Sequence, residues 1–336
     1  MERTIDVHNH FYPKEWLDYL QTRKKGPRME QKGPELAVLY LNDTAIATIR
    51  RPGHFDPKER LKDLDRCGID TQVLSLTTPS IELLPPEEGV KWAKRANDIF
   101  ADVCQKYPGR YYATAALPYQ DVDEAVKELD RAYKDLKVKG IMMFSNVNGK
   151  SIASPEFDPI YARAEKYDLP IFIHPGMPVT LEAMKSAGPT AVGVYGFTLD
   201  TTLAVMSLIW QGILERYPRL TIIHAHLGGV VPYLVWRMEE MWRLSHITQE
   251  SEVKLKKTPS EYYKSQVYPD SVSFHLPAMR CCLEFVGPRH ICLGTDYAHR
   301  MGNWDEAVDY VKKMSLSKED TELILGGNAA RIFKIE

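Results

Sequence analysis

Three observations predict that this chain is an α/β protein, a (β/α)8 TIM barrel with a small β-hairpin insertion after strand 1. Short apolar runs alternate with segments whose apolar residues recur at helical spacing, an order typical of parallel βαβ units. About eight such units follow one another along the chain. The length of 336 residues is one that α/β barrels commonly fill alone, so residues 1–336 are expected to form a single domain.

The expected strands are short, mostly apolar and bounded by turn residues. They lie at residues 4–8, 71–76, 111–116, 138–144, 170–174, 220–224, 266–268 and 290–294. The clearest helix begins at Asp56-Pro57, where a capping residue precedes proline at the first helical position, and ends at Gly68. Similar patterns predict helices over residues 85–106, 121–136, 155–167, 201–217, 232–244, 274–285, 303–314 and 318–333.

One early stretch departs from this alternation. Residues 36–41 and 45–49 are strand-like, and the polar pair Asn42-Asp43 between them favours a β-hairpin. We assign it to a small insertion, residues 14–55, that follows the first strand and reaches over the top face of the barrel.

Composition excludes several classes of protein. The formal net charge is -2, so no broad field attracts nucleic acid or anionic lipid. Neither a signal peptide nor a long apolar span is evident, and no membrane partner is expected. The five cysteines are scattered and odd in number, which is typical of reduced thiols. A cytoplasmic protein is the expectation.

His8 and His10 are the most informative residues for function. Side chains at i and i+2 of a strand point to the same face, so two imidazoles at this spacing can converge on one metal ion. The alternative is a pair of solvated loop histidines, which so short a motif does not exclude by itself.

Other polar residues fall where predicted strands end, the face on which barrels of this kind carry their active sites. His174 ends the fifth strand, His224 and His226 end the sixth, and Asp296 follows the eighth. Three imidazoles and one carboxylate suit one divalent metal ion, Zn²⁺ above all, with Mn²⁺, Fe²⁺ or Co²⁺ as alternatives. His226 precedes Leu227-Gly228-Gly229, where small residues let the backbone approach a ligand. We therefore assign His226 to the site and His224 to a supporting role.

The chain resembles the amidohydrolase superfamily, and within it the amidohydrolase 2 branch that contains 2-amino-3-carboxymuconate-6-semialdehyde decarboxylase. The motifs that carry the resemblance run from end to end: Asp6-Val7-His8-Asn9-His10-Phe11-Tyr12-Pro13, Phe55-Asp56-Pro57, His174-Pro175, Phe197-Thr198-Leu199-Asp200-Thr201-Thr202, His226-Leu227-Gly228-Gly229, Gly294-Thr295-Asp296-Tyr297 and Gly327-Asn328-Ala329. The resemblance implies an amidohydrolase-type barrel. It also implies one metal ion, Zn²⁺ in that decarboxylase, held by the residues that match its ligands: His8, His10, His174 and Asp296.

The resemblance further implies how a substrate is bound and protonated. His226 matches the catalytic acid/base, and Asp296 could share in proton transfer. Arg51 matches one substrate-binding arginine, with Arg50 as an adjacent alternative. Arg237, eleven residues after His226, matches an arginine that reaches the neighbouring subunit of a homodimer. Without the resemblance, either arginine is a solvated surface charge.

Two departures from the family pattern put the muconate semialdehyde in question as substrate. Gly193, with Tyr195 nearby, stands where that decarboxylase has a tryptophan. Tyr297-Ala298-His299-Arg300 stands where the family often has Tyr-Pro-Phe. Neither departure touches the expected ligands.

These residues favour a metal-dependent, non-oxidative decarboxylase, a carbon–carbon lyase acting on an unsaturated or aromatic carboxylic acid. The alternative is a metal-dependent hydrolase or hydratase of the same superfamily, acting on a lactone, an amide or an oxalomesaconate-type acid. A non-catalytic barrel is the third hypothesis, but it predicts the loss of a ligand, and every expected ligand is present.

Overall fold

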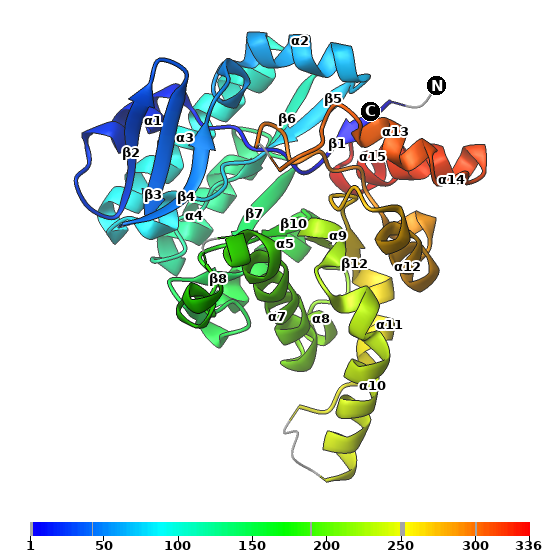
Figure 1. Cartoon of the computed structure of the whole chain (residues 1–336). Helices are drawn as coiled ribbons and strands as arrows, with labels where there is room; N and C mark the ends of the chain where they lie inside the picture. Colours follow the sequence, from blue (N-terminus) through cyan, green and yellow to red (C-terminus); the bar gives the residue numbers. More distant parts are fainter. Residues whose placement is uncertain (1–2, 42, 189, 249–252, 300) are drawn as a thin grey trace.

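A curled, parallel, seven-stranded sheet forms the centre of the computed structural model, which describes residues 3–41, 43–188, 190–248, 253–299 and 301–336 (Figure 1). The strand order follows the sequence, so every neighbour is reached through a crossover, as βαβ units require. The strands, in this order, are β1 (Ile5–Asp6), β5 (Thr71–Leu74), β6 (Tyr111–Ala115), β7 (Gly140–Phe144), β10 (Ile171–His174), β11 (Ile222–His224) and β12 (Val267–Pro269).

Residues 291–297 join the two edges of this sheet in place of the predicted eighth strand. The amide of Val7 donates to the Leu293 carbonyl at 3.0 Å, and the amide of Cys292 donates to the Pro269 carbonyl, also at 3.0 Å. Only isolated parallel bridges form here, because nearby amides donate to side chains instead; the Gly294 amide, for example, donates to Ser271 Oγ. The arrangement is consistent with a TIM barrel.

Helices surround the sheet, and several begin and end where the sequence indicates. Asp56 caps α2 (Pro57–Cys67), and Gly68 ends this helix in the left-handed conformation. The other long helices at predicted positions are α3 (Pro86–Lys106), α4 (Val122–Lys134), α5 (Asp158–Tyr167), α7 (Phe197–Trp210), α10 (Val231–Ile247) and α12 (Leu276–Val286). These helices cover the outer face of the sheet, except that α10 projects away from it (Figure 1).

Three predicted helices are shorter or divided. The segment 201–217 breaks at Gly212, whose φ of 70° ends α7 and separates it from α8 (Ile213–Arg216). The segment 303–314 is helical only in α13 (Ala307–Lys312). A π-helical turn, Leu323–Gly327, separates α14 (Lys318–Glu322) from α15 (Asn328–Phe333).

A three-stranded antiparallel sheet stands beside the barrel, instead of a hairpin alone. The predicted segments pair as β3 (Leu36–Leu41) and β4 (Thr44–Ile49), although Asn42 of the expected turn lies outside the described residues. The additional strand is β2 (Pro27–Gly33), which escaped prediction because charged and polar residues interrupt it. Helix α1 (Lys14–Thr22), also not predicted, contacts β2.

The five cysteines are free. The sequence was expected to lack a long apolar span, but residues 192–210 form a helix that by length and composition alone could cross a membrane. Half of this segment is buried within the protein.

Candidate metal centre

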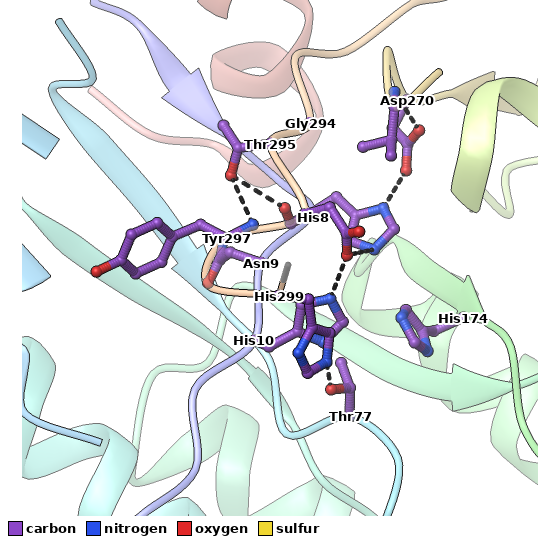
Figure 2. Close-up of polar contacts among 12 residues, drawn as sticks. His8, Asn9, His10, Thr77, His174, Asp270, Gly294, Thr295, Tyr297 and His299 are labelled. Carbon is purple, nitrogen blue, oxygen red and sulfur yellow. Dashed lines mark hydrogen bonds and ion pairs between the residues drawn. The ribbon is translucent and has the colours of Figure 1, made fainter. Parts of the chain in front are cut away.

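His8 lies two residues after the end of β1, and only one of its ring nitrogens forms a hydrogen bond; the other lies 3.6 Å from Oδ1 of Asp296. Its Nδ1 donates to Oδ2 of Asp270 at 2.5 Å, and both side chains are fully buried (Figure 2). Burial disfavours the charged ring, but the carboxylates of Asp270 and Asp296 outweigh this effect and raise the pKa of His8. Its Nε2 has no hydrogen-bond partner among the described residues. A buried nitrogen of this kind is unfavourable unless it receives a ligand.

His10 and His174 approach His8 from the ends of β1 and β10. Nδ1 of His10 lies 2.5 Å from Thr77 Oγ1, and its Nε2 lies 2.5 Å from Asp296 Oδ1. Nδ1 of His174 donates to the Pro175 carbonyl at 3.0 Å, which leaves its Nε2 as a bare acceptor. Burial, reinforced by the neighbouring imidazoles, holds the pKa of both rings well below the usual value. Both are therefore neutral at pH 7, the state in which imidazole binds metals.

These side chains form one compact group, which we call the histidine cluster: His8, His10, His174, His226 and Asp296. One candidate ligand atom each from His8, His10 and His174 lies within 4.8 Å of the others, and the same holds for His8, His226 and Asp296. His8 belongs to both sets. Imidazole nitrogens beside a carboxylate form a donor set that fits a divalent transition metal.

Asp296 reaches the cluster because residues 291–297 run alongside β1. Its amide donates to the His8 carbonyl at 2.8 Å, which fixes the two residues side by side. The backbone of Asp296 is left-handed, with φ of 57°, so the chain turns away from the sheet at this carboxylate.

A left-handed turn after β11 brings His226 to the cluster. His226 and Leu227 have φ of 57° and 56°, and the His226 ring lies 5.0 Å from the ring of His8. The Leu227 amide donates to Oδ1 of Asp270 at 3.1 Å, so one carboxylate fixes both the turn and His8. A Cβ on Gly229 would lie 2.3 Å from Thr202 Oγ1, so the turn requires glycine here.

His224 faces away from this group. It is the last residue of β11, and its Nδ1 lies 3.0 Å from the hydroxyl of Tyr263 on α11 (Pro259–Gln266). Burial lowers the pKa of His224 to about 3, so the ring is neutral. The alternation of the strand separates it from the site, whereas the left-handed turn redirects His226.

A cavity of about 200 Å³ lies beside the cluster and contains both candidate arginines that precede Pro52. The guanidinium of Arg51 stands 4.8 Å from the ring of Trp304. His299, which the sequence left without a role, lines the cavity and lies 3.8 Å from His10, centroid to centroid. The lining residues are Thr48, Arg50, Arg51, His54, Ala298, His299, Gly302, Trp304 and Asp305.

Three residues singled out in the sequence do not line this cavity. Arg237 is exposed on α10 and is not among the residues that line it. Tyr195 is 59% exposed, and Gly193 lies in the π-helical turn Val192–Gly196 that precedes α7. A single copy of the chain therefore does not bring Arg237 to the histidine cluster.

Sequence reasoning missed Asp270 and Thr77, which orient two of the histidines. The signal for Asp270 was available, because it follows the seventh predicted strand as Asp296 follows the eighth. Thr77 follows the second strand within a run of hydroxyl residues and offered no comparable signal.

Comparisons with known proteins show the family to which the chain belongs. The profile of the amidohydrolase family matches residues 5–335. The gamma-resorcylate decarboxylase of Rhizobium sp. (strain MTP-10005) is 31% identical over 291 residues, which cover 82% of this chain and 86% of that protein. The 2-amino-3-carboxymuconate-6-semialdehyde decarboxylase of Dictyostelium discoideum is 28% identical over 339 residues, which cover 99% of this chain and 92% of the other.

A solved structure extends the likeness to the fold. The 5-carboxyvanillate decarboxylase of Novosphingobium aromaticivorans, crystallised with manganese and 4-hydroxy-3-methoxy-5-nitrobenzoic acid, superposes with a TM-score of 0.86 at 27% identity. The match covers 99% of this chain and 96% of that one. The resemblance read from the motifs is thus confirmed, and the chain belongs to the amidohydrolase family, among relatives that are decarboxylases.

Proposed function

We propose that this protein is a metal-dependent, non-oxidative decarboxylase that removes CO₂ from a small unsaturated or aromatic carboxylic acid. The observation that carries the proposal is the histidine cluster, in which buried imidazoles and a carboxylate converge beside a cavity that two arginines line. Relatives that match most of the chain are decarboxylases, and solved neighbours were crystallised with aromatic acids. Carboxylate substrates also suit arginine, whose planar fork binds them in two places.

His8, His10, His174 and Asp296 would hold one divalent metal ion. When bound, this ion supplies a Lewis acid that polarises a substrate oxygen. The donor set alone favours Zn²⁺. Because the solved relative was crystallised with manganese, we propose Mn²⁺ and Zn²⁺ equally. Fe²⁺ or Co²⁺ would accept the same ligands.

His226 is the proposed proton carrier. Burial, assisted by the nearby His8, lowers the pKa of His226, so the ring is neutral at pH 7 with one nitrogen protonated and the other bare. Its Nδ1 has no hydrogen-bond partner among the described residues. The bare nitrogen of His226 first takes up a proton from solvent. When the bond to the carboxyl carbon breaks, CO₂ leaves and the electron pair stays on the substrate carbon; His226 delivers the proton there and returns to its neutral form. Asp296 lies beside it and could share in the transfer.

Arg51 is the proposed carboxylate-binding residue within one subunit, and Arg50 lines the same cavity. Arg237 fits a role only towards a second copy of the chain. It is exposed on α10 beside exposed apolar residues, of which Tyr233 is 83% and Trp236 73% exposed. A homodimer that covers this face would let α10 present Arg237 to the neighbouring site.

The reaction is tested by incubating metal-loaded protein with a panel of hydroxybenzoic and muconate-type acids and measuring CO₂ release. We expect release from at least one acid. His226→Ala should abolish that release while the metal content stays unchanged, and His290→Ala, at the opposite end of the barrel, should leave both unchanged. Hydrolysis of lactones or hydration of an oxalomesaconate-type acid, with no CO₂ from any acid, would establish the hydrolase or hydratase instead.

The shared site is tested by mixing two inactive variants. Arg237→Ala removes the group donated to the partner, and His226→Ala removes the proton carrier of the same subunit. A mixed dimer regains one complete site, so mixing after mild dissociation should restore part of the activity. Absence of recovery, with mixed dimers demonstrated by differential tagging, would refute the role of Arg237 towards the partner.

A further inference from the structure

His174 is held in place differently from His8. Nδ1 of His8 donates directly to the carboxylate of Asp270, whereas Nδ1 of His174 donates to a backbone carbonyl, that of Pro175, at 3.0 Å. The partner behind a ligating histidine fixes the tautomer and makes the ring a better ligand. A neutral carbonyl does this less strongly than a carboxylate. The groups that contact the Pro175 peptide therefore determine how well His174 is held.

The peptide unit that joins Pro175 to Gly176 is fixed at both ends. Its carbonyl oxygen accepts a second hydrogen bond, from Thr78 Oγ1 at 3.0 Å. Its N–H group, on Gly176, donates to Oγ of Ser145 at 2.9 Å. Hydrogen bonds in a chain polarise one another, so a peptide whose N–H is engaged presents a more negative carbonyl oxygen. The acceptor of His174 is thus both fixed and strengthened from its far side.

The chain of hydrogen bonds ends at Asp200, in the first turn of α7. The hydroxyl of Ser145 donates to Oδ2 of Asp200, which also accepts from Nδ2 of Asn146 at 2.8 Å. Oδ1 accepts from the amide of Val179 at 3.0 Å. Three donors therefore converge on one carboxylate that is only 3% exposed. Asp200 belongs to the motif 197–202, to which the proposed function gives no role.

Every hydrogen in this chain points the same way, from the imidazole towards the carboxylate. The order is Nδ1–H of His174, the Pro175–Gly176 peptide, the hydroxyl of Ser145 and the carboxylate of Asp200. Because a carboxylate only accepts, it draws the hydroxyl hydrogen of Ser145 to itself and leaves the hydroxyl oxygen to accept from the peptide. All of these residues are buried, where hydrogen bonds are electrostatically stronger than in water.

We propose that Asp200 is a positioning residue for the metal centre, which acts on His174 through Ser145 and the peptide unit between them. The distant carboxylate gives His174 what Asp270 gives His8 directly, a negative charge behind the ring that favours a cation at Nε2. The inference rests on the proposed function for the metal, but the chain of hydrogen bonds is also testable in metal-free protein.

The first measurement is the affinity for Zn²⁺, by competition against a chromophoric chelator. Ser145→Ala removes the hydroxyl in the middle of the chain. Asp200→Asn replaces one carboxylate oxygen with an amino group, which faces a donor in either orientation of the amide. We expect each variant to bind Zn²⁺ about tenfold more weakly, the lower end of the usual range, because the Pro175 carbonyl remains. Ser145→Thr keeps the hydroxyl and should restore most of the affinity.

Thr71→Val is the matched control. It also removes the hydroxyl of a buried residue that donates to a carbonyl, that of Gly109 at 2.7 Å. Thr71 begins β5 and lies at the opposite end of the barrel from the histidine cluster. Thr71→Val should therefore leave the Zn²⁺ affinity unchanged, even if it lowers the melting temperature.

A nuclear magnetic resonance signal separates positioning from a merely structural role. In metal-free protein with isotope-labelled histidines, the Nδ1–H proton of His174 is identified by its loss in His174→Ala. We expect its resonance to move upfield in Ser145→Ala and Asp200→Asn, because a weaker hydrogen bond deshields the proton less. The resonance should stay in place in Thr71→Val.

The positioning role would be overturned by an unmoved His174 resonance in both Ser145→Ala and Asp200→Asn, or by an equal shift in Thr71→Val. Melting temperatures identify a variant that fails to fold, and the other of the two then carries the test. Weakened Zn²⁺ binding in these variants, with no CO₂ released from any acid, would refute the decarboxylase alone. CO₂ release with unaltered Zn²⁺ affinity in both variants would refute the positioning role alone.

Discussion

The carboxylate of Asp270 is easily tested, because it contacts both His8 and the turn that carries His226. Oδ2 accepts from His8 at 2.5 Å, and Oδ1 accepts from the Leu227 amide at 3.1 Å. Asp270→Asn should weaken metal binding by about 10–100-fold, as is usual when the partner of a ligating histidine is replaced. Competition against a chromophoric chelator measures the change. Asp168→Asn, at an exposed helix end, should bind metal as the unsubstituted protein does.

Glu82 makes a second residue-scale prediction, this time about pH. It is 2% exposed, and burial raises its pKa to about 8. The folded protein thus retains a proton that the unfolded chain loses near pH 4.5, so Glu82 makes stability fall as pH rises between those values. In Glu82→Gln, the free energy of unfolding should depend less on pH. The difference in this free energy between the variant and the unsubstituted protein should increase from pH 5 to pH 9 in favour of the variant, by several kcal/mol at most.

Urea unfolding across this pH range measures that gain, with Glu35→Gln, an exposed position, as the control. A gain that does not depend on pH would show that Glu82 is ionised in the folded protein.

At the residue scale, the sequence predicted the five members of the histidine cluster because each stands where an apolar run ends. It could not predict which nitrogen of His8 is free, since that depends on Asp270, a contact that arises only in three dimensions. Nor could it place His299 against His10.

The turn after β11 is the element on which the position of His226 depends. A Cβ on Gly229 would lie 2.3 Å from Thr202 Oγ1 and 2.6 Å from the Thr198 carbonyl, and the backbone φ is 60°. Gly229→Ala should therefore lower the free energy of unfolding by about 2 kcal/mol or more. Gly33→Ala, where a Cβ would meet nothing within 4 Å, should cost far less. Thermal unfolding of both variants measures these changes. An equal loss of stability in the two variants would contradict the steric argument.

Among the elements, apolar periodicity predicted the seven regular strands and most of the helices, since burial in this fold follows strand and helix periods closely. The eighth segment was predicted as a regular strand, but it forms only isolated bridges. Its amides bond to side chains such as Ser271 and Asp6 instead of a neighbouring strand, and no periodic pattern encodes such contacts. Helix α11 carried an overlooked signal, the capping box of Thr258 and Glu261.

At the scale of the whole molecule, the proposed ligands come from residues far apart in the chain: His8, His174 and Asp296. A metal bound to all of them should stabilise the folded state alone. At about 100 times its dissociation constant, it should add about 3 kcal/mol to the free energy of unfolding. Calorimetric scans with and without a chelator measure this gain, and His174→Ala should lose most of it. A melting temperature insensitive to metal would contradict the assigned ligands.

The segment 291–297, which joins β12 to β1, also determines when the protein becomes complete during its synthesis. A ribosome releases β1 first, but the strand edges that this segment covers stay open until residue 296 has emerged. Exposed edges of this kind pair readily with other chains. Chains that end before the segment 291–297 should therefore aggregate instead of accumulating as inactive enzyme. With the proposed ligands, a metal would be captured only after residue 296 has emerged, when His8 and His10 meet Asp296.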